Sequence, residues 1–492
     1  MTDLKINKLN EVYIHIECEK GIAQELSDFF TFKVPGFQFT PAFKNRIWDG
    51  NIRLFDRRYN TLYFGLYPYV EKFCKDRSYT YTIHSDVNCT NEFSLIEAEN
   101  LIERLNIPSN IDKRDYQIKS FVNGIRSGRM LLVSPTASGK SFILYLLLRW
   151  AQESGYKKGL LIVPSTALVE QMYKDFADYG YDSEKYCHRQ YAGKEKSTDK
   201  FLTLSTWQSI YTNPPEYFEQ FDFVFGDEAH EFKAKSCSAI MSSLVNASLR
   251  IGCTGTLDGT QTNKLVLEGL FGPKYQVIST NEMIEQGYAA QLQIKCIVLK
   301  HEEKIGVLSK KWKYPDEINY LVSNKSRNNF IKNLTISLKG NTLVLFNLVE
   351  KHGKELYRII NDVSKKRKVF FVFGGTDVEQ RESVRQITEL EKDAIIIASY
   401  GTFSRGINIR NLHNIIFASP SKSRIRNLQS IGRSLRIGNN KDEAVLYDIS
   451  DDLRVKIGDK PNYTLDHFLS RLKIYDDEKF PYKIYNVRLK NE

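Results

Sequence analysis

The sequence lacks the features that mark membrane-spanning, secreted and disulfide-rich proteins. No run among its 492 residues approaches the roughly 18 consecutive apolar residues that a membrane-spanning helix requires. Residues 1–5 open no hydrophobic stretch of the kind found in secretory signal peptides. The seven cysteines are scattered without a CxxC pair, and their odd number argues against a disulfide framework. We therefore expect reduced thiols, a cytoplasmic location and no membrane partner.

What the sequence does contain is enough apolar side chain for several cores and an excess of positive charge. Hydrophobic residues make up 42% of the chain and aromatic residues 12%. A chain of this length is expected to contain about three domains. The 70 Lys and Arg residues outnumber the 59 Asp and Glu residues, which gives a formal net charge of +11. This charge favours a polyanionic partner such as nucleic acid.

The first motif is a phosphate-binding loop. The octapeptide Ser-Pro-Thr-Ala-Ser-Gly-Lys-Ser lies between an apolar strand-like segment, 131–133, and a helical segment, 142–150. At such a turn, backbone N–H groups and the positive end of the helix dipole hold phosphate oxygens. Lys140 would reach the β- and γ-phosphates, and the Ser141 hydroxyl would bind Mg²⁺. The predicted nucleotide-binding residues of this loop are Ser134, Pro135, Thr136, Ala137, Ser138, Gly139, Lys140 and Ser141.

An acidic pair follows a second apolar segment. Asp227 and Glu228 come directly after residues 223–225, in the tetrad Asp-Glu-Ala-His. Open α/β sheets place ligands outside the carboxyl ends of their strands, so Asp227 would bind Mg²⁺ and Glu228 would polarise the attacking water. A solvated acidic turn after a core strand is common in isolation. Behind a phosphate loop at this distance, however, the pair predicts an ATPase with ATP and Mg²⁺ as cofactors.

Two alternations of short apolar strands with helical stretches predict two parallel α/β domains. The predicted strands are 160–163, 201–204 and 223–225, then 343–346, 369–373, 395–397, 415–417 and 444–449. We expect an N-terminal α+β domain at 1–95, a first motor domain at 96–285 and a second at 286–492, with ATP in the cleft between the motor domains. The charged segment 300–339 is expected to hold a hairpin or an extended helix, and the tail 463–492 to pack on the second domain.

The remaining motifs occur in a fixed order around the acidic tetrad. They are Arg-Asp-Tyr-Gln at 114–117, Val-Pro-Ser-Thr-Ala-Leu-Val-Glu-Gln at 163–171, Ser-Thr-Trp-Gln-Ser at 205–209, Thr-Gly-Thr at 254–256, Ala-Ser-Tyr-Gly-Thr-Phe-Ser-Arg-Gly-Ile-Asn at 398–408 and Gln-Ser-Ile-Gly-Arg-Ser-Leu-Arg at 429–436. With the loop and the tetrad, the order resembles the full motif set of superfamily 2 helicases, whose motor domains have a RecA-like fold. Ser134 and Ala137 depart from it, because many relatives have Ala or Gly there.

The resemblance implies a role for each motif. Gln117 would hydrogen-bond the adenine edge, because a side-chain amide offers a donor and an acceptor together. Arg433 and Arg436 would reach the γ-phosphate from the second domain and stabilise the transferring group. Taken alone, such an RxxR pair is usually a basic helix face, and Thr-Gly-Thr can be a plain polar turn. The further nucleotide contacts implied are Arg114, Gly406 and Asn408, and the coupling residues implied are His230, Thr254, Thr256 and Gln429.

Short polar side chains follow the predicted strands of both motor domains. Hydroxyl and amide groups at strand ends suit phosphate oxygens and carry little sequence information. Each of them could equally be a loop hydroxyl or a helix cap. As an ordered set they predict a path for a DNA strand, formed by Thr166, Gln171, Thr206 and Gln208 in the first domain and by Asn347, Ser399 and Thr402 in the second.

The N-terminal region interleaves basic and aromatic residues. Lys44 and Arg46 alternate with Phe43 and Trp48, a composition that suits phosphate pairing combined with base stacking. A strand-rich domain with an aromatic core and a basic surface has the same composition, and Trp48 fits a core position better. We predict Lys44 and Arg46 as DNA contacts. We also expect the motor domains to stay folded without residues 1–95, because their cores and all nucleotide motifs lie downstream.

Residues 37–66 also resemble the first domain of UvsW-type phage recombination helicases. That resemblance implies an ATP-dependent DNA helicase that migrates junctions, regresses forks and dissociates D-loops and R-loops in recombination, repair and replication. Its expected partners are branched and single-stranded DNA, with RNA–DNA hybrids and a single-strand-binding protein as further candidates, and the expected state is a monomer in the host cytoplasm. Two alternatives stay open: a DEAH-type RNA helicase, and a double-strand translocase subunit that never separates strands.

Overall fold

The apolar segments of the first motor domain form one parallel sheet in the computed structural model, which describes residues 2–87, 90–191, 198–257, 259–364, 366–406, 409, 411–419, 421–435 and 443–489. The strand order is β13-β7-β12-β11-β8-β10-β9, and every pairing is parallel. The strands are β7 (Arg129–Val133), β8 (Gly159–Val163), β9 (Cys187–Gln190), β10 (Leu202–Thr206), β11 (Phe223–Gly226), β12 (Leu249–Thr254) and β13 (Lys274–Gln276).

Helices flank this sheet, and the five strands from β7 to β10 in the spatial order are buried along their whole length. Burial on both faces explains why these strands are continuous apolar runs instead of alternating patterns. The helices are α4 (Leu95–Arg104), α5 (Asp115–Ser127), α6 (Lys140–Glu153), α7 (Thr166–Asp178), α8 (Ser183–Tyr186), α9 (Trp207–Ile210), α10 (Pro215–Phe218), η4 (Ala229–Lys233), α11 (Lys235–Ser243) and α12 (Gln261–Phe271).

A second parallel sheet, in the order β16-β17-β15-β18-β19-β14-β20, lies in the other half of the chain. By their contacts, the residues divide into one compact unit of Met1–Ser134 with Gly139–Val277 and another of Pro135–Ser138 with Ile278–Glu492. The strands of the second unit are β14 (Gln291–Lys300), β15 (Thr342–Phe346), β16 (Val369–Val372), β17 (Ile395–Ser399), β18 (Asn414–Phe417), β19 (Glu443–Asp452) and β20 (Tyr482–Arg488). The expected pair of RecA-like parallel-sheet domains is thereby confirmed.

The helices of the second unit correct one expectation and confirm another. Segment 300–339 contains neither a hairpin nor one extended helix but three helices, and the last of them is fixed by a buried ion pair between Arg327 and Asp451 with an Nε–Oδ1 distance of 2.9 Å. The tail packs on this unit as expected, because β20 pairs with β14. The helices are α13 (Thr280–Glu285), α14 (Glu303–Ser309), α15 (Tyr314–Ser323), α16 (Lys325–Ser337), η5 (Val349–Gly353), α17 (Lys354–Asn361), α18 (Val378–Leu390), α19 (Tyr400–Gly406), α20 (Arg424–Ser434) and α21 (Tyr463–Asp477).

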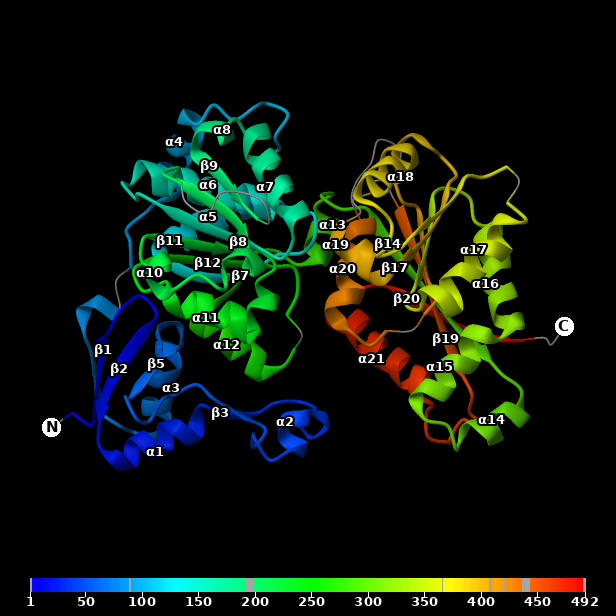
Figure 1. The fold of residues 1–492 in the computed structure, drawn as a ribbon, viewed down its shortest axis with the longest axis horizontal. Helices are drawn as coiled ribbons and strands as arrows, with labels where there is room; N and C mark the ends of the chain where they lie inside the picture. Colours follow the sequence, from blue (N-terminus) through cyan, green and yellow to red (C-terminus); the bar gives the residue numbers. More distant parts are fainter. Residues whose placement is uncertain are drawn as a thin grey trace. The chain divides into compact units, whose positions relative to one another are not determined.

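The N-terminal α+β domain consists of a body and an arm. The body, residues 2–30 and 54–87, has a four-stranded mixed sheet in the order β5-β2-β1-β6. It contains β1 (Leu4–Lys8), β2 (Tyr13–Cys18), α1 (Lys20–Phe29), β5 (Thr61–Tyr63), η2 (Phe64–Leu66), α3 (Tyr67–Arg77), β6 (Tyr81–Ile83) and η3 (Ser85–Val87). The arm, residues 31–53, is a separate antiparallel pair of β3 (Thr31–Lys33) and β4 (Asn51–Arg53) that carries η1 (Phe37–Phe39) and α2 (Pro41–Lys44) (Figure 1).

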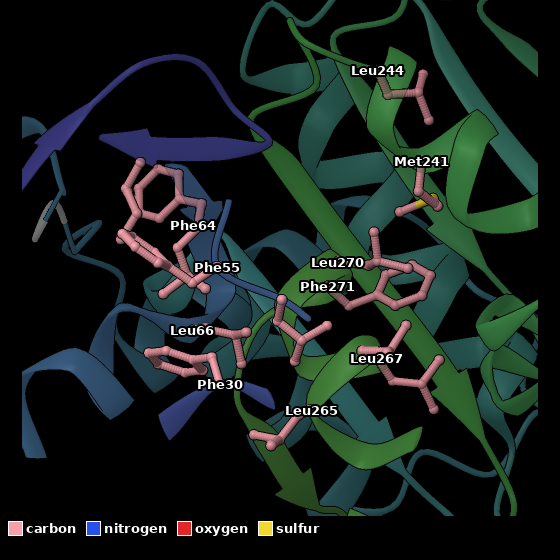
Figure 2. Packing of buried hydrophobic residues seen from close by; sticks show 14 of the residues in the cluster. Phe30, Phe55, Phe64, Leu66, Met241, Leu244, Leu265, Leu267, Leu270 and Phe271 are labelled. Carbon is pink, nitrogen blue, oxygen red and sulfur yellow. The ribbon is translucent and has the colours of Figure 1, made fainter. Parts of the chain in front are cut away.

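The body shares a hydrophobic core with the first motor domain. One cluster of buried side chains contains Phe30, Phe55, Phe64 and Leu66 from the body together with Leu265, Leu267, Leu270 and Phe271 from α12 (Figure 2). The backbones also meet, because a Cβ atom on Gly65 would lie 1.9 Å from the carbonyl oxygen of Glu268. The core of the motor domain therefore does not lie wholly downstream of residue 95. The premise of the expectation from the sequence is therefore wrong, and we no longer expect this domain to fold without residues 1–95.

Polar contacts reinforce the seam between the body and the motor domain. The guanidinium of Arg129, the first residue of β7, lies 2.9 Å from the Glu11 carboxylate and 3.6 Å from the centre of the Phe64 ring. Burial lowers the pKa of Arg129 to about 10, and the Glu11 carboxylate opposes this shift. The Tyr69 hydroxyl donates to the Glu268 carboxylate at 2.6 Å. A buried ion pair of this kind is costly to break from one side, because the remaining charge is left without compensation.

Candidate active site

The phosphate loop begins where β7 ends and closes at the first turn of α6. The Ser134 N–H donates to the carbonyl oxygen of Thr254 at 2.8 Å, which ties the start of the loop to β12. Gly139 precedes α6 with a left-handed φ of 82°, a conformation that glycine adopts without strain. Ala137 is also left-handed, with φ of 70°. Because Ala carries a Cβ atom, this conformation costs about 1 kcal/mol, and the sequence departs from the helicase pattern at this same residue.

Polar side chains of the loop form hydrogen bonds within the loop and with the segment after α7. Lys140 Nζ donates to the Ser134 carbonyl oxygen at 3.2 Å, so the ammonium lies over the loop. The Ser138 hydroxyl donates to the carbonyl oxygen of Pro135 at 2.7 Å. The Ser141 hydroxyl lies 2.8 Å from the hydroxyl of Tyr179 on the segment after α7. Burial raises the pKa of Tyr179 to about 12.

Gln117 lies against the end of the phosphate loop. A Cβ atom on Gly139 would lie 2.2 Å from Gln117 Nε2, so the end of the Gln117 side chain packs directly against this glycine. The Gln117 side-chain oxygen accepts a hydrogen bond from the Arg114 backbone N–H at 3.1 Å, at the start of α5. The guanidinium of Arg114 donates to the Tyr116 hydroxyl at 2.8 Å. The fold thus brings the Arg-Asp-Tyr-Gln motif next to the loop, whereas adenine recognition by Gln117 stays a prediction.

Asp227 has the environment of a metal ligand. It follows β11, and its backbone N–H donates to the Ile162 carbonyl oxygen at 3.0 Å. The carboxylate is 5% exposed, and its Oδ1 has no hydrogen-bond partner among the residues that the structure describes. Burial raises the pKa of Asp227 to about 6, and the charge of Glu228 adds to this. A buried carboxylate oxygen in need of a partner fits Mg²⁺, which prefers oxygen ligands, and the Ser141 hydroxyl could supply another.

Glu228, His230 and Thr254 form a connected group. Glu228 has a left-handed φ of 51° and precedes η4. His230 Nδ1 lies 3.3 Å from the Glu228 carboxylate and 3.0 Å from the Thr254 hydroxyl. The Thr254 hydroxyl donates to the carbonyl oxygen of Thr256 at 3.2 Å. Residues predicted separately for water activation and for coupling therefore contact one another at the carboxyl ends of β11 and β12.

The second unit positions its predicted nucleotide residues, and the predicted coupling residue Gln429, on two helices. Gln429 and Arg433 lie on α20, where residues four apart share one face. Gly406 is the last residue of α19. Asn408 and Arg436 lie outside the residues that the structure describes. The roles of these residues at the γ-phosphate and the nucleotide edge stay predictions.

The predicted strand-end contacts divide into exposed and buried groups. The exposed side chains are Thr166, Gln171, Gln208 and Asn347. Thr206 is buried, and its hydroxyl lies 2.8 Å from that of Ser209. Thr402 is buried as well, and its hydroxyl lies 2.8 Å from that of Ser399. For Thr206 and Thr402 the structure favours the alternative interpretation, a hydroxyl pair within the turn after the strand.

The arm separates the N-terminal residues that sequence reasoning had grouped together. Lys44 and Arg46 are exposed, as a DNA contact requires. Trp48 is half-buried within the arm, and its indole N–H donates to the Asn51 carbonyl oxygen at 2.7 Å. Sequence reasoning missed Phe39 and Ile47, which are 74% and 78% exposed at the end of the arm. No pattern in the sequence distinguishes these two from the aromatic and aliphatic residues of the core.

Three protein families match successive parts of the chain. The family described as "DNA helicase UvsW, N-terminal" matches residues 3–84, which cover the body and the arm. "Type III restriction enzyme, res subunit" matches residues 110–259, which contain the phosphate loop and the acidic tetrad. "Helicase conserved C-terminal domain" matches residues 326–438. Across the described ranges, no helix is long and apolar enough to cross a membrane.

Individual relatives agree with these matches. The chain is 35% identical to "ATP-dependent DNA helicase uvsW" of Enterobacteria phage T4, over 99% of this chain and 100% of the relative. It is 33% identical to the crystal structure of T4 UvsW, with a TM-score of 0.54 over 99% of this chain and 100% of that one. It is also 24% identical to "DNA 3'-5' translocase XPB2" of Sulfurisphaera tokodaii, over 71% of this chain and 85% of the relative. The chain belongs to the UvsW family of ATP-dependent DNA helicases.

Proposed function

We propose that this helicase uses ATP hydrolysis to remodel branched DNA by migrating junctions, regressing forks and dissociating D-loops and R-loops. The observation that carries the proposal is the arm, which presents Lys44 and Arg46 to solvent from a domain that shares its core with the ATP-binding domain. A DNA branch bound by the arm would be attached to the same packed unit that holds Lys140, Asp227 and Glu228. Movement of this unit along one strand would therefore act directly on the branch.

The chemistry at the nucleotide follows from the residues of both motor domains. Lys140 would bind the β- and γ-phosphates, and Glu228 would take a proton from the attacking water. Mg²⁺, held by Asp227 and Ser141, would neutralise phosphate charge. Arg433 and Arg436 would stabilise the negative charge that develops on the transferring group. The contact of His230 with both Glu228 and Thr254 supports a coupling role, because it connects the carboxylate that would activate water to the end of the next strand.

A substrate panel tests the proposed function. ATP hydrolysis and strand separation should be measured with single-stranded DNA, linear duplex, a four-way junction, RNA and an RNA–DNA hybrid. We expect DNA to stimulate hydrolysis and the four-way junction and the hybrid to be separated. Stimulation by duplex without any strand separation would instead identify a double-strand translocase. Equal stimulation and unwinding with RNA alone would identify an RNA helicase.

The first prediction concerns the nucleotide site. Lys140→Ala should abolish ATP hydrolysis, because the loop loses its positive side chain. Glu228→Gln should still bind ATP and Mg²⁺, whereas its turnover should fall by about 10²- to 10⁴-fold, because an amide accepts no proton. Turnover is measured by phosphate release and binding by a fluorescent ATP analogue. Glu219→Gln, an exposed glutamate of the same domain, serves as the control. Near-normal turnover in either site variant would remove that residue from the active site.

A further inference from the structure

The end of the arm exposes two large apolar side chains that nothing in the established activity explains. Phe39 is 74% exposed and Ile47 is 78% exposed. Every residue of the arm, 31–53, is described, and Gly50 alone is buried. Both side chains belong to this one short arm, and exposed apolar patches commonly mark a binding surface. The arm therefore has the character of a ligand-binding element.

The arm is preorganised, because its own packing fixes its shape. The Phe37 and Phe43 rings meet edge to face with centroids 4.6 Å apart. Gly50 has a left-handed φ of 82°, and a Cβ atom there would lie 2.3 Å from the Phe37 ring. The Thr40 hydroxyl donates to the Phe37 carbonyl oxygen at 2.8 Å and accepts from the Phe43 N–H at 3.4 Å. These contacts use Phe37 and Phe43 internally, so Phe39 and Ile47 are left pointing to solvent.

The arm that carries the two apolar side chains has an excess of positive charge. The arm carries four positive residues (Lys33, Lys44, Arg46 and Arg53) against one negative residue, Asp49. Arg53 pairs with Asp49, whereas Lys44 and Arg46 form no ion pair with any residue in the described ranges. Ile47 also lines a hollow of about 790 Å³ together with Phe43, Lys44, Arg46 and Trp48. Basic groups without an ion-pair partner, beside a hollow whose lining mixes aromatic, aliphatic and charged side chains, complement a ligand that is both anionic and flat-faced.

We propose that Phe39 and Ile47 form a wedge that enters a DNA branch point and packs on the last base pair, while Lys44 and Arg46 hold the adjoining phosphates. Base faces are apolar, and at a branch they are not fully covered by stacking, so they can receive such side chains. A protein partner fits less well, because a stable protein interface buries roughly 800 Å² on each side and depletes lysine from its centre. The inference rests on the proposed function and names the residues that recognise the branch.

The test places 2-aminopurine at the branch point of a four-way junction and follows its fluorescence in the absence of nucleotide. The full-length protein should brighten the probe, because the wedge unstacks it. Phe39→Ala with Ile47→Ala should remove the brightening and slow junction processing by about tenfold or more, the loss expected when one base–aromatic stack is removed. ATP hydrolysis stimulated by plain single strands should be unchanged. Phe39→Trp with Ile47→Leu should restore both signals, because bulk and apolar character return.

Two further variants make the result specific. Lys44→Ala with Arg46→Ala should weaken junction binding yet brighten the probe once the protein saturates the junction. Leu390→Ala, a variant of another apolar side chain that is 86% exposed, should behave as the wild type. Wild-type brightening and processing in the Phe39/Ile47 double variant would overturn the wedge. If the unaltered protein brightens the probe but does not process the junction with ATP, the proposed function fails while the wedge stands.

Discussion

The body and the arm of the N-terminal domain are both rich in aromatic residues, but those residues have opposite environments in the two parts. Aromatic residues of the body, such as Phe30 and Phe55, are buried in a core that continues into α12. In the arm no aromatic side chain is buried, and Phe39 is 74% exposed. The comparison teaches that one domain serves two purposes. Its body stabilises the ATP-binding domain, and its arm remains available for a ligand.

The largest effect on stability is expected when the whole N-terminal domain is deleted, in contrast to replacement of the arm alone. Removing residues 2–95 should leave an insoluble or molten protein, because the apolar side chains of α12 and the guanidinium of Arg129 lose their cover. Replacing residues 34–50 with a short Gly-Ser linker should instead change the free energy of unfolding by no more than about 0.5 kcal/mol, as surface changes usually do. Circular dichroism melting and size-exclusion chromatography measure both outcomes. A soluble, cooperatively melting deletion variant would show that the body is dispensable for folding.

A single added methyl group sharpens the comparison at the seam. Gly65→Ala places a Cβ atom 1.9 Å from the Glu268 carbonyl oxygen, and backbone on both sides leaves little room to relax. We expect a loss of about 1–3 kcal/mol in the free energy of unfolding, the usual cost of overpacking. Gly21→Ala in α1 is the matched control, because nothing lies within 4 Å of its Cβ position. Chemical denaturation of the two variants measures the difference, and equal stabilities would show that the two backbones can separate freely.

The smallest effect on stability belongs to the charged side chains of the arm. Lys44→Ala with Arg46→Ala should leave the melting temperature unchanged and make DNA binding less dependent on salt. Each lost phosphate contact should flatten the log–log slope by roughly 0.7 for single strands or 0.9 for duplex. Fluorescence anisotropy titrations at several salt concentrations give the slope. Lys20→Ala with Lys75→Ala, two exposed lysines of the body, is the control. An equal change in the control would mean that general charge, and not the arm, binds DNA.

Much of the motor fold could be predicted from the sequence, because its strands are continuous apolar runs. β8, β11 and β15 occupy almost the predicted ranges, and the phosphate loop lies at the predicted turn. Strand β14 was not predicted, although it lies between β19 and β20, because its first half alternates buried and exposed residues instead of forming a continuous apolar run. Segment 300–339 resisted prediction for a related reason. Its helices depend on tertiary contacts such as the Arg327–Asp451 pair, whose partners are far apart in the sequence.

The residues of the candidate site could be predicted from the sequence, but the contacts between them could not. Motif spacing located Glu228, His230 and Thr254, yet their mutual contacts depend on the adjacency of β11 and β12 in the sheet. For the arm, the sequence could not even show which apolar residues are exposed. Phe39 and Phe55 belong to one basic and aromatic segment, and composition cannot tell which of them faces water. Burial of Thr206 and Thr402 likewise follows from packing that a pattern of polar residues does not contain.

The close approach of Gly65 to Glu268 also bears on how such a protein can be inherited. Two gene segments that are merely fused end to end meet through surfaces that were already soluble apart. Here each of the two segments has a glycine where they meet. Gly65 lies in the N-terminal body, and Gly269 lies in α12, where a Cβ atom would be 2.9 Å from the Cβ atom of Tyr63. Neither segment could be exchanged for an unrelated one without exposing apolar side chains or creating a clash. The two are therefore expected to descend together as one lineage, and a motor domain with a different ancestry would need another way to cover α12.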